Sequence, residues 1–342
     1  MTMENHKSEK KVTLEPVDIN KVAEDIDPRD IIEQDSKLTE ELDPETTEEI
    51  QLVHCKIQSL EALNLYKFKN LKNLCLRTNL IESISDLESL SLYNTIEEID
   101  LYDNRIKHIS KYVNKLTNLT SLDLSFNQIK HLQNIENLEK LENLYLVANN
   151  ISEIGDIFGK GNFHKLINLE LGGNSVAQIS GLINLPNLEE LWLGKNMIRK
   201  FENLQYLKNL KILSIQSNKI KKIEGLEQLE NLEELYLSHN AIEEIENLDK
   251  NLKLTTLDIT ANRLTTVKNL KHLTNLTDLW LSFNNIDMTF EQLHEEIGHL
   301  GCLETIYLER NPIQLKNETS YRRKLVMNLS PNLEKIDATY IK

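Results

Sequence analysis

Long apolar runs are missing from this 342-residue chain, although 40% of its residues are hydrophobic. No stretch reaches the 18 consecutive apolar residues that a membrane-spanning helix needs. The opening MTMENHKSEKK is polar and continues into acidic sequence, so it does not resemble a secretory signal. These absences predict a soluble intracellular protein with no membrane partner.

Metal-binding patterns are also absent from the sequence. The three cysteines, Cys55, Cys75 and Cys302, have neither the spacing of metal ligands nor a secreted setting, so we predict free thiols. His294 and His299 enclose two glutamates, as in a zinc motif. They are five residues apart rather than four, however, and do not share one helical face. We therefore predict no bound metal.

Catalytic motifs cannot be found either. The glycines Gly155, Gly159 and Gly161 are not followed by the strand-to-helix signature of a phosphate-binding loop. They mark an insertion that lengthens one repeat to 25 residues. An elongated repeat array also offers no pocket with convergent polar groups. The sequence predicts a protein that is not an enzyme and has no cofactor.

Charge is unevenly distributed along the chain, whose formal net charge is −15. Residues 1–49 contain 16 acidic and 6 basic residues and no aromatic residue. Such a segment lacks the apolar groups that stabilise a fold, so we predict that residues 1–49 are disordered. The acidity argues against a nucleic-acid partner, because phosphate recognition needs stripes of lysine and arginine.

Asparagine, in contrast, recurs at a nearly constant interval. Most successive copies are 22 residues apart, and each closes the pattern LxxLxLxxNxI. This pattern is typical of leucine-rich repeats, in which cysteine is an accepted substitute for asparagine. The predicted asparagine ladder, with one member in each of twelve repeats, is Cys55, Asn79, Asn104, Asn127, Asn149, Asn174, Asn196, Asn218, Asn240, Asn262, Asn284 and Asn311.

The repeats predict an α/β fold, a leucine-rich-repeat solenoid. We expect a right-handed superhelix with a parallel β-sheet on the concave face and short helical or 3-10 segments on the convex face. Stacking is required because no coil buries its apolar face alone. The amide side chain of each ladder asparagine can satisfy backbone groups that the inner turn leaves unpaired. We place the array at residues 50–313 and a C-terminal cap at residues 314–342, closed by Leu325, Val326, Leu329, Leu333 and Ile336.

The residue between the two leucines of LxL is predicted to face the concave surface, because side chains alternate along a strand. Five of these twelve positions are aromatic and four are acidic, in a chain that is 6% aromatic. Strand propensity alone favours Tyr and Trp, so a plain exposed sheet is the alternative to a binding face. The twelve positions are Gln51, Cys75, Asp100, Asp123, Tyr145, Glu170, Trp192, Ser214, Tyr236, Asp258, Trp280 and Tyr307, flanked by Tyr102, Glu190, Glu234, Asp278 and Glu309.

Several motifs resemble those of the leucine-rich-repeat regulatory subunit of type-1 serine/threonine protein phosphatase, a family with the same 22-residue period. The motifs are IDLYDNRI (99–106), LDLSFN (122–127), LWLGKNMI (191–198), QSNKIKKIEGL (216–226), ELYLSHNAIEEIENL (234–248) and IYLERNP (306–312). The ending YRRKLVMNLSPNLEKIDATYI (321–341) is similar to the family's C-terminal cap. The resemblance extends from about residue 50 to the end.

The resemblance implies a non-catalytic subunit that holds the phosphatase catalytic subunit on its concave face and controls its maturation, location or activity. It also implies a nuclear and cytoplasmic protein, with room for a third regulatory protein as partner. The predicted partner-binding residues are Asp123, Tyr145, Glu170, Trp192, Tyr236, Asp258, Asp278, Trp280 and Tyr307, of which all but Tyr236 match the family's phosphatase-contacting positions in type.

Two other classes of repeat protein remain as alternatives. A scaffold of another intracellular assembly, spliceosomal or cytoskeletal, could share the cap but would not be expected to repeat the aromatic and acidic face. An activator of small GTPases would have longer coils, near 28–29 residues, and an arginine on a loop. The 22-residue period argues against such an activator.

Overall fold

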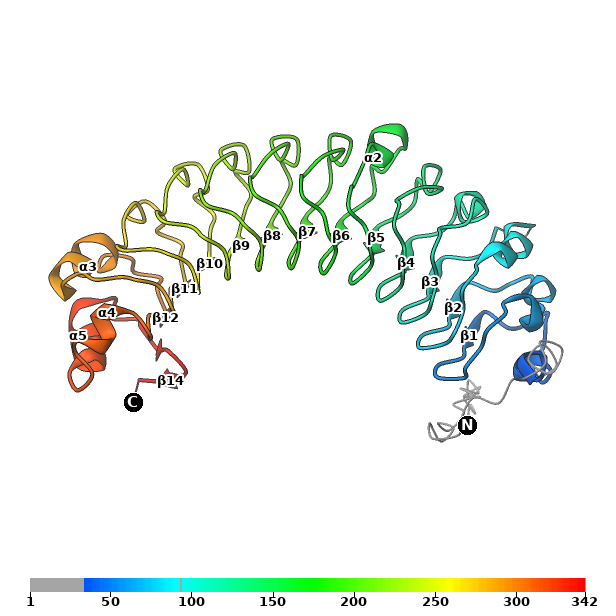
Figure 1. Ribbon diagram of the computed structural model, residues 1–342, viewed down its shortest axis with the longest axis horizontal. Coiled ribbons are helices and arrows are strands. Elements are labelled where there is room, and N and C mark those ends of the chain that lie inside the picture. The colour runs from blue at the N-terminus through cyan, green and yellow to red at the C-terminus, as the bar shows by residue number, and fades with distance from the viewer. Residues whose placement is uncertain (1–33, 93, 342) are drawn as a thin grey trace, which may run out of the picture.

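The computed structural model describes residues 34–92 and 94–341, which form an open arc of stacked coils (Figure 1). One 14-stranded sheet follows chain order from β1 to β14 along the inner side of the arc. All neighbouring strands that these residues form are parallel except β13 and β14, which are antiparallel. The predicted leucine-rich-repeat solenoid is therefore confirmed.

Each strand is short, because one coil contributes only a brief extended segment before the asparagine turn. The strands are β1 (Glu49–Gln51), β2 (Asn73–Cys75), β3 (Glu98–Asp100), β4 (Ser121–Asp123), β5 (Asn143–Tyr145), β6 (Asn168–Glu170), β7 (Glu190–Trp192), β8 (Ile212–Ser214), β9 (Glu234–Tyr236), β10 (Thr256–Asp258), β11 (Asp278–Trp280), β12 (Thr305–Tyr307), β13 (Lys335–Ile336) and β14 (Thr339–Tyr340). The twelve concave positions singled out in the sequence are the last residues of β1 to β12.

Helical segments lie on the outer side of the arc and at both of its ends (Figure 1). The inserted 25-residue coil forms α2 on the outer side, so the extra residues leave the pairing of β5 with β6 intact. The helices are η1 (Lys37–Thr39), η2 (Glu61–Leu63), η3 (Leu65–Lys67), η4 (Ser85–Leu92), η5 (Val113–Lys115), α2 (Ile157–Lys160), α3 (Phe290–Ile297), α4 (Pro312–Leu315) and α5 (Tyr321–Asn328). No helix of the described residues is long and apolar enough to span a membrane.

A single apolar core runs through the stack, because the two leucines of each LxL segment point inward. Leu144 and Leu146 are completely buried on either side of Tyr145, as are Leu191 and Leu193 around Trp192. This alternation leaves the middle residue on the concave face. The core thereby positions every side chain of the candidate site.

The asparagine ladder connects each coil to the one before it. The side-chain amide of Asn149 donates to Leu124 O (2.9 Å) in the preceding coil and to Leu146 O (3.2 Å) in its own. Its Oδ1 accepts a hydrogen bond from Ile129 N (2.9 Å). The same inter-coil pattern is made by Asn79, Asn104, Asn127, Asn174, Asn196, Asn218, Asn240, Asn262, Asn284 and Asn311.

Asn284→Ala is expected to lower the free energy of unfolding by about 3 kcal/mol, because each buried backbone group left unpaired costs roughly 1–3 kcal/mol. Asn284 donates to Ile259 O (2.8 Å) and accepts from Leu264 N (3.0 Å). The neighbouring Asn285 is exposed, so Asn285→Ala is the matched control. Urea unfolding followed by circular dichroism compares the two variants. Equal midpoints would contradict a stabilising role for the ladder.

Cys55 behaves differently from the asparagines at the equivalent position. Its thiol lies 3.5 Å from Val53 O in its own turn, and its backbone N–H donates to Asn79 Oδ1 (3.0 Å). Burial raises the pKa of the Cys55 thiol. No described coil precedes the first repeat, so a side chain that bonds only within its own turn is sufficient there.

The predicted disorder of residues 1–49 is wrong for residues 34–49, while residues 1–33 lie outside the described part of the chain. The buried Asp35 carboxylate accepts hydrogen bonds from Gln58 N (3.1 Å) and Ser59 N (3.5 Å). Leu38 and Leu42 pack against the core of the first coil. Residues 34–49 form a short N-terminal cap that does not follow the 22-residue period. The spacing of the leucine-rich repeats therefore does not predict it.

The C-terminal segment covers the other end of the apolar core. Helix α5 packs against α3, and His294 Nδ1 lies 2.6 Å from Asn328 O. Four of the five residues assigned to the cap core are buried, namely Leu325, Leu329, Leu333 and Ile336. Val326 is not; 46% of its surface is exposed, since it lies on the outer side of α5.

Candidate partner-binding surface on the concave face

Four rings form a continuous aromatic row on the C-terminal half of the concave face: Trp192, Tyr236, Trp280 and Tyr307. The Trp192 and Tyr236 ring centroids are 6.2 Å apart and nearly parallel at 19°. The centroids of Tyr236 and Trp280 are also 6.2 Å apart, and those of Trp280 and Tyr307 are 5.9 Å apart with an edge-on geometry. Ring pairs at these distances stabilise one another beyond the area they bury.

Rings from strands two apart can touch because short side chains lie between them. Ser214 on β8 is 1% exposed and separates Trp192 from Tyr236 in the register. Asp258 on β10 is 5% exposed and lies between the Tyr236 and Trp280 strands. The alternation of large and short residues therefore closes the row over the sheet.

Asp258 does not present an exposed carboxylate, contrary to its assignment as an open acidic position of the concave face. It is buried at the register position between two large rings, and its Oδ1 accepts a hydrogen bond from Thr260 N (2.9 Å). Asp100 and Asp123 bond in the same way to the backbone N–H two residues on. Aspartate at this position thus has a local structural role, while Asp123 also keeps part of its side chain exposed.

Carboxylates at the start of the same strands hold two of the rings. The Trp192 indole N–H donates to Glu190 Oε2 (3.2 Å), and the Tyr236 hydroxyl donates to Glu234 Oε2 (2.6 Å). Burial, together with the Glu234 carboxylate, holds the pKa of the Tyr236 hydroxyl well above its usual range. Trp192 and Tyr236 are consequently held in place before any partner binds.

Trp280 lacks such a tether. The corresponding residue Asp278 accepts instead from Thr277 Oγ1 (2.8 Å), and the buried Trp280 Nε1 has no hydrogen-bond partner among the described residues. A buried donor without an acceptor costs roughly 1–3 kcal/mol. The Trp280 indole is therefore held by its ring neighbours Tyr236 and Tyr307 and not by a hydrogen bond of its N–H group.

Acidic side chains gather beside the N-terminal end of the row. The register places Asp123, Tyr145, Glu170 and Trp192 on four successive strands. Burial raises the pKa of Glu170, and the charges of Asp123 and Glu190 add to this effect. Burial, reinforced by Glu170, likewise raises the pKa of the Tyr145 hydroxyl. This part of the face is suited to a cationic partner surface.

A second cluster joins the predicted concave residues Asp100 and Tyr102 to Arg77 and Phe126, which the sequence reasoning missed. The Arg77 guanidinium lies 4.3 Å above the centre of the Tyr102 ring, and Tyr102 packs on Phe126 with centroids 4.8 Å apart. Arg77 also forms an ion pair with Asp100 (3.2 Å). Burial raises the pKa of Asp100, although Arg77 opposes that change. The face therefore continues beyond Asp123 toward β2.

Phe126 and Phe283 also extend the surface, with 45% and 54% of their areas exposed. Both precede a ladder asparagine in a Ser-Phe-Asn segment and have positive φ angles of 55° and 57°. A large aromatic residue in that conformation is uncommon. The repeated SFN motif is the sequence signal for these residues, which lie in the turn after the strand and therefore outside the alternation of the strand positions.

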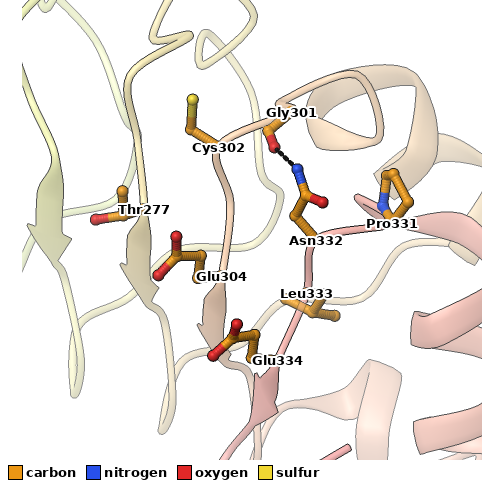
Figure 2. Close-up of a pocket in the computed structure, with 8 residues that line it drawn as sticks. All are labelled: Thr277, Gly301, Cys302, Glu304, Pro331, Asn332, Leu333 and Glu334. Carbon is orange, nitrogen blue, oxygen red and sulfur yellow. Dashed lines mark hydrogen bonds between the residues drawn. The ribbon is translucent and has the colours of Figure 1, made fainter.

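A surface hollow lies near the C-terminal end of the arc (Figure 2). It is lined by Thr277, Gly301, Cys302, Glu304, Pro331, Asn332, Leu333 and Glu334 (Figure 2). None of these residues is basic, and the Asn332 side chain donates to Gly301 O (2.7 Å). His294 and His299 bond to different backbone carbonyls, Asn328 O and Lys271 O. Within the described residues no cluster could hold a metal ion.

Comparison with known proteins places this geometry in a family. Models of leucine-rich repeats match residues 94–151, and a two-copy model matches residues 164–206 and 208–250. The chain is 61% identical over 343 residues to the protein phosphatase 1 regulatory subunit SDS22 of Saccharomyces cerevisiae, with 94% of each chain covered. The chain belongs to the SDS22 family of protein phosphatase 1 regulatory subunits.

Membership in the SDS22 family confirms the resemblance that the motifs indicated. The chain is also 36% identical over 180 residues to the protein phosphatase 1 regulatory inhibitor subunit PPP1R7 homolog of Arabidopsis thaliana, with 52% of each chain covered. Among solved structures, an internalin of Listeria monocytogenes matches with a TM-score of 0.72, covering 92% of this chain and 90% of that chain. At 23% identity the internalin shows the shared fold alone.

Proposed function

We propose that this SDS22-family chain is a non-catalytic regulatory subunit that binds the catalytic subunit of type-1 serine/threonine protein phosphatase on its concave face. The observation that carries the proposal is the aromatic row, flanked by carboxylates, on the face that a partner can enter. Binding energy at protein interfaces is concentrated in such aromatic anchors. The printed name of the yeast relative supports the choice of partner.

The size of the concave face also suits a folded protein. Neighbouring strands are about 4.8 Å apart, so the eleven intervals from β1 to β12 span roughly 53 Å. A domain of about 300 residues has a radius of gyration near 19 Å. Such a domain can contact many coils together, whereas a metabolite would need an enclosed pocket with convergent polar groups.

The carboxylates of the concave face indicate which charges the docked surface of the phosphatase carries. Asp123, Glu170 and Asp278 are partly exposed on the concave face. Asp123 lies 4.0 Å from Arg77, while Glu170 and Asp278 form no ion pair with a lysine or arginine in the described part of the chain. Complementarity therefore calls for lysine and arginine on the docked surface of the phosphatase. Such complementarity raises the association rate and sets the register of the complex.

The direct test is isothermal titration of the purified chain with purified type-1 phosphatase catalytic subunit, combined with light scattering of the mixture. We expect a complex with one copy of each protein. Absence of binding heat and of a larger species at tens of micromolar would overturn the proposal. A pull-down from lysate with the intact chain would then identify which repeat-protein assembly it joins instead.

We also propose that the protein is nuclear and cytoplasmic and that a third regulatory protein joins the complex. Both follow from the family resemblance. A fluorescently tagged chain, viewed in cells with nuclear and membrane markers, tests the location; exclusion from the nucleus would contradict it. Mass spectrometry of the complex purified through the phosphatase tests for a third stoichiometric component.

Affinity for the phosphatase is expected to fall as the pH is lowered from 7.5 into the range in which Glu170 of the free chain gains a proton, which lies above the ordinary range of a glutamate. The raised pKa of Glu170 means that it loses its charge at a higher pH than an ordinary glutamate. A cationic partner lowers that pKa again, so the complex binds fewer protons than the free chain and acid favours dissociation. Glu170→Gln is expected to bind more weakly at pH 7.5 and to show a smaller pH dependence in the same titration. Identical pH profiles would exclude Glu170 from the contact.

A further inference from the structure

The concave sheet does not end at the last repeat. Strand β13 pairs in parallel with β12, matching Ile306 with Ile336, and β14 returns antiparallel with Lys335 opposite Tyr340. The chain thus places Lys335 and Tyr340 beside Tyr307, which is the last ring of the aromatic row. In Figure 1 this hairpin lies at the inner rim of the C-terminal end of the arc.

The Lys335 side chain lies close to two tyrosine rings. Its ammonium group is 5.3 Å from the centre of the Tyr307 ring and 5.8 Å from that of Tyr340. Hydrogen bonding to the Tyr307 side chain and attraction to Tyr307, Tyr340 and Asp278 raise the pKa of Lys335, so it remains charged. It forms no ion pair with a carboxylate within 4.0 Å in the described part of the chain.

Tyr340 is 68% exposed, more than any other large aromatic side chain of the described residues. Its backbone is nevertheless held in place. Arg322 on α5 donates to Ile336 O (2.8 Å), Thr339 O (3.2 Å) and Tyr340 O (3.3 Å). An exposed ring on a fixed backbone loses little conformational entropy when a partner covers it, because a tyrosine has few rotatable bonds.

The base of the hairpin is fixed by a buried aspartate that takes a ladder-like role. Asp337 Oδ1 accepts from Leu308 N (2.9 Å) and Glu309 N (3.0 Å), and Asp337 N donates to Ile306 O (2.8 Å). The Tyr321 hydroxyl also donates to this carboxylate (3.3 Å). The hairpin is therefore continuous with the rigid sheet rather than a loose end.

We propose that the β13–β14 hairpin is part of the phosphatase-binding surface, with Tyr340 as an additional anchor and Lys335 as a cation that pairs with an acidic side chain of the phosphatase. The proposal rests on the function proposed above. It adds that the two ends of the binding surface carry opposite charges. Most of the concave face selects basic partner residues, while its C-terminal end selects an acidic one. Opposite charges at two ends of a footprint fix the orientation in which the phosphatase docks.

Titration of the full-length chain with the type-1 phosphatase catalytic subunit tests the proposal. Tyr340→Ala is expected to weaken binding at least about tenfold, as truncation of an aromatic anchor does. Tyr206→Ala is the matched control, because Tyr206 is 44% exposed in a return segment away from the concave strands. Melting temperatures of both variants should equal that of the wild type, since both rings are exposed.

Lys335→Glu raises or lowers the affinity for the phosphatase according to the charge of the partner residue, and so distinguishes an acidic from a basic partner residue. An acidic partner residue would make Lys335→Glu bind at least about tenfold more weakly. A basic partner residue, as on the rest of the face, would make it bind more tightly and would overturn the proposal. Lys250→Glu, at an exposed return-segment position, controls for the change in net charge.

Failure of this inference is distinguishable from failure of the proposed function. If the wild-type chain binds and Trp280→Ala weakens binding while Tyr340→Ala does not, the hairpin lies outside the contact and only this inference is wrong. If the wild-type chain itself does not bind the phosphatase, the proposed function is wrong. Weakening by both Tyr340→Ala and Lys335→Glu, with silent controls, supports the proposal.

Discussion

Trp280→Ala is expected to weaken phosphatase binding by at least about 2 kcal/mol, or roughly 30-fold, and Trp192→Ala by a similar amount. Trp280 should give the larger loss because it has ring neighbours on both sides, Tyr236 and Tyr307, whereas Trp192 ends the row. Removing Trp280 also uncovers Asp258, which lies opposite it on the neighbouring strand. Titration calorimetry measures both effects.

Two controls keep this result interpretable. Lys221→Ala changes an exposed residue outside the concave strands and should leave the affinity unchanged. Trp192→Phe retains a ring beside Tyr236 but loses the hydrogen bond to Glu190, so it should fall between wild type and Trp192→Ala. Unchanged affinity after replacing both tryptophans by alanine would exclude the aromatic row as the phosphatase-binding surface.

Truncation after Leu315 is expected to lower the melting temperature by at least about 10 °C and to cause aggregation. It removes five buried apolar or aromatic side chains, Tyr321, Leu325, Leu329, Leu333 and Ile336, and uncovers the face of α3 on which α5 packs. Each buried side chain contributes roughly 1.5–3 kcal/mol, much of which is offset by the entropy of ordering the segment. In a domain of this size about 1 kcal/mol shifts the melting temperature by roughly 2–4 °C. Calorimetry and light scattering measure the outcome.

A pair of point variants tests the same cap without removing the hairpin. Ile336→Asn places an amide in the apolar core, where Ile336 is fully buried, and should destabilise the chain strongly. Val326→Asn makes the same kind of change at a position with 46% exposure and should be nearly silent. Equal melting temperatures for the two would show that the C-terminal segment does not close the core. A truncated chain that melts normally but no longer binds would make the segment a contact surface only.

The concave positions could be predicted because they depend on one local rule. Alternation along each strand sends Tyr145, Trp192 and Trp280 to the face opposite their leucine neighbours, whatever the curvature of the arc. The burial of Asp258 could not be predicted in this way. It depends on rings from the two flanking strands, and ring orientation is determined by packing between coils.

Phe126, Phe283 and the capping residues escaped prediction for a related reason. The two phenylalanines belong to the turn, where direction follows from a left-handed backbone conformation rather than from alternation. Asp35 acts at the solenoid end through hydrogen bonds to residues more than 20 positions away. Asp35 does not share the repeat period, so a periodic pattern contains no information about it. The position before each ladder asparagine does recur, and the phenylalanines there could have been found from the repeated Ser-Phe-Asn segment.

The sequence by itself determined the repeat fold, the strand positions, the ladder asparagines and the family, because each is encoded by a local motif repeated at a constant spacing. Only the tertiary structure decided which concave residues are open, which are covered, and how far the sheet continues at its C-terminal end. Lys335 and Tyr340 show the difference. They follow a helix and a turn and lie outside the LxL pattern, yet the return of β14 along β13 brings them beside Tyr307. Contacts of this kind depend on how coils stack in space, which sequence spacing does not specify.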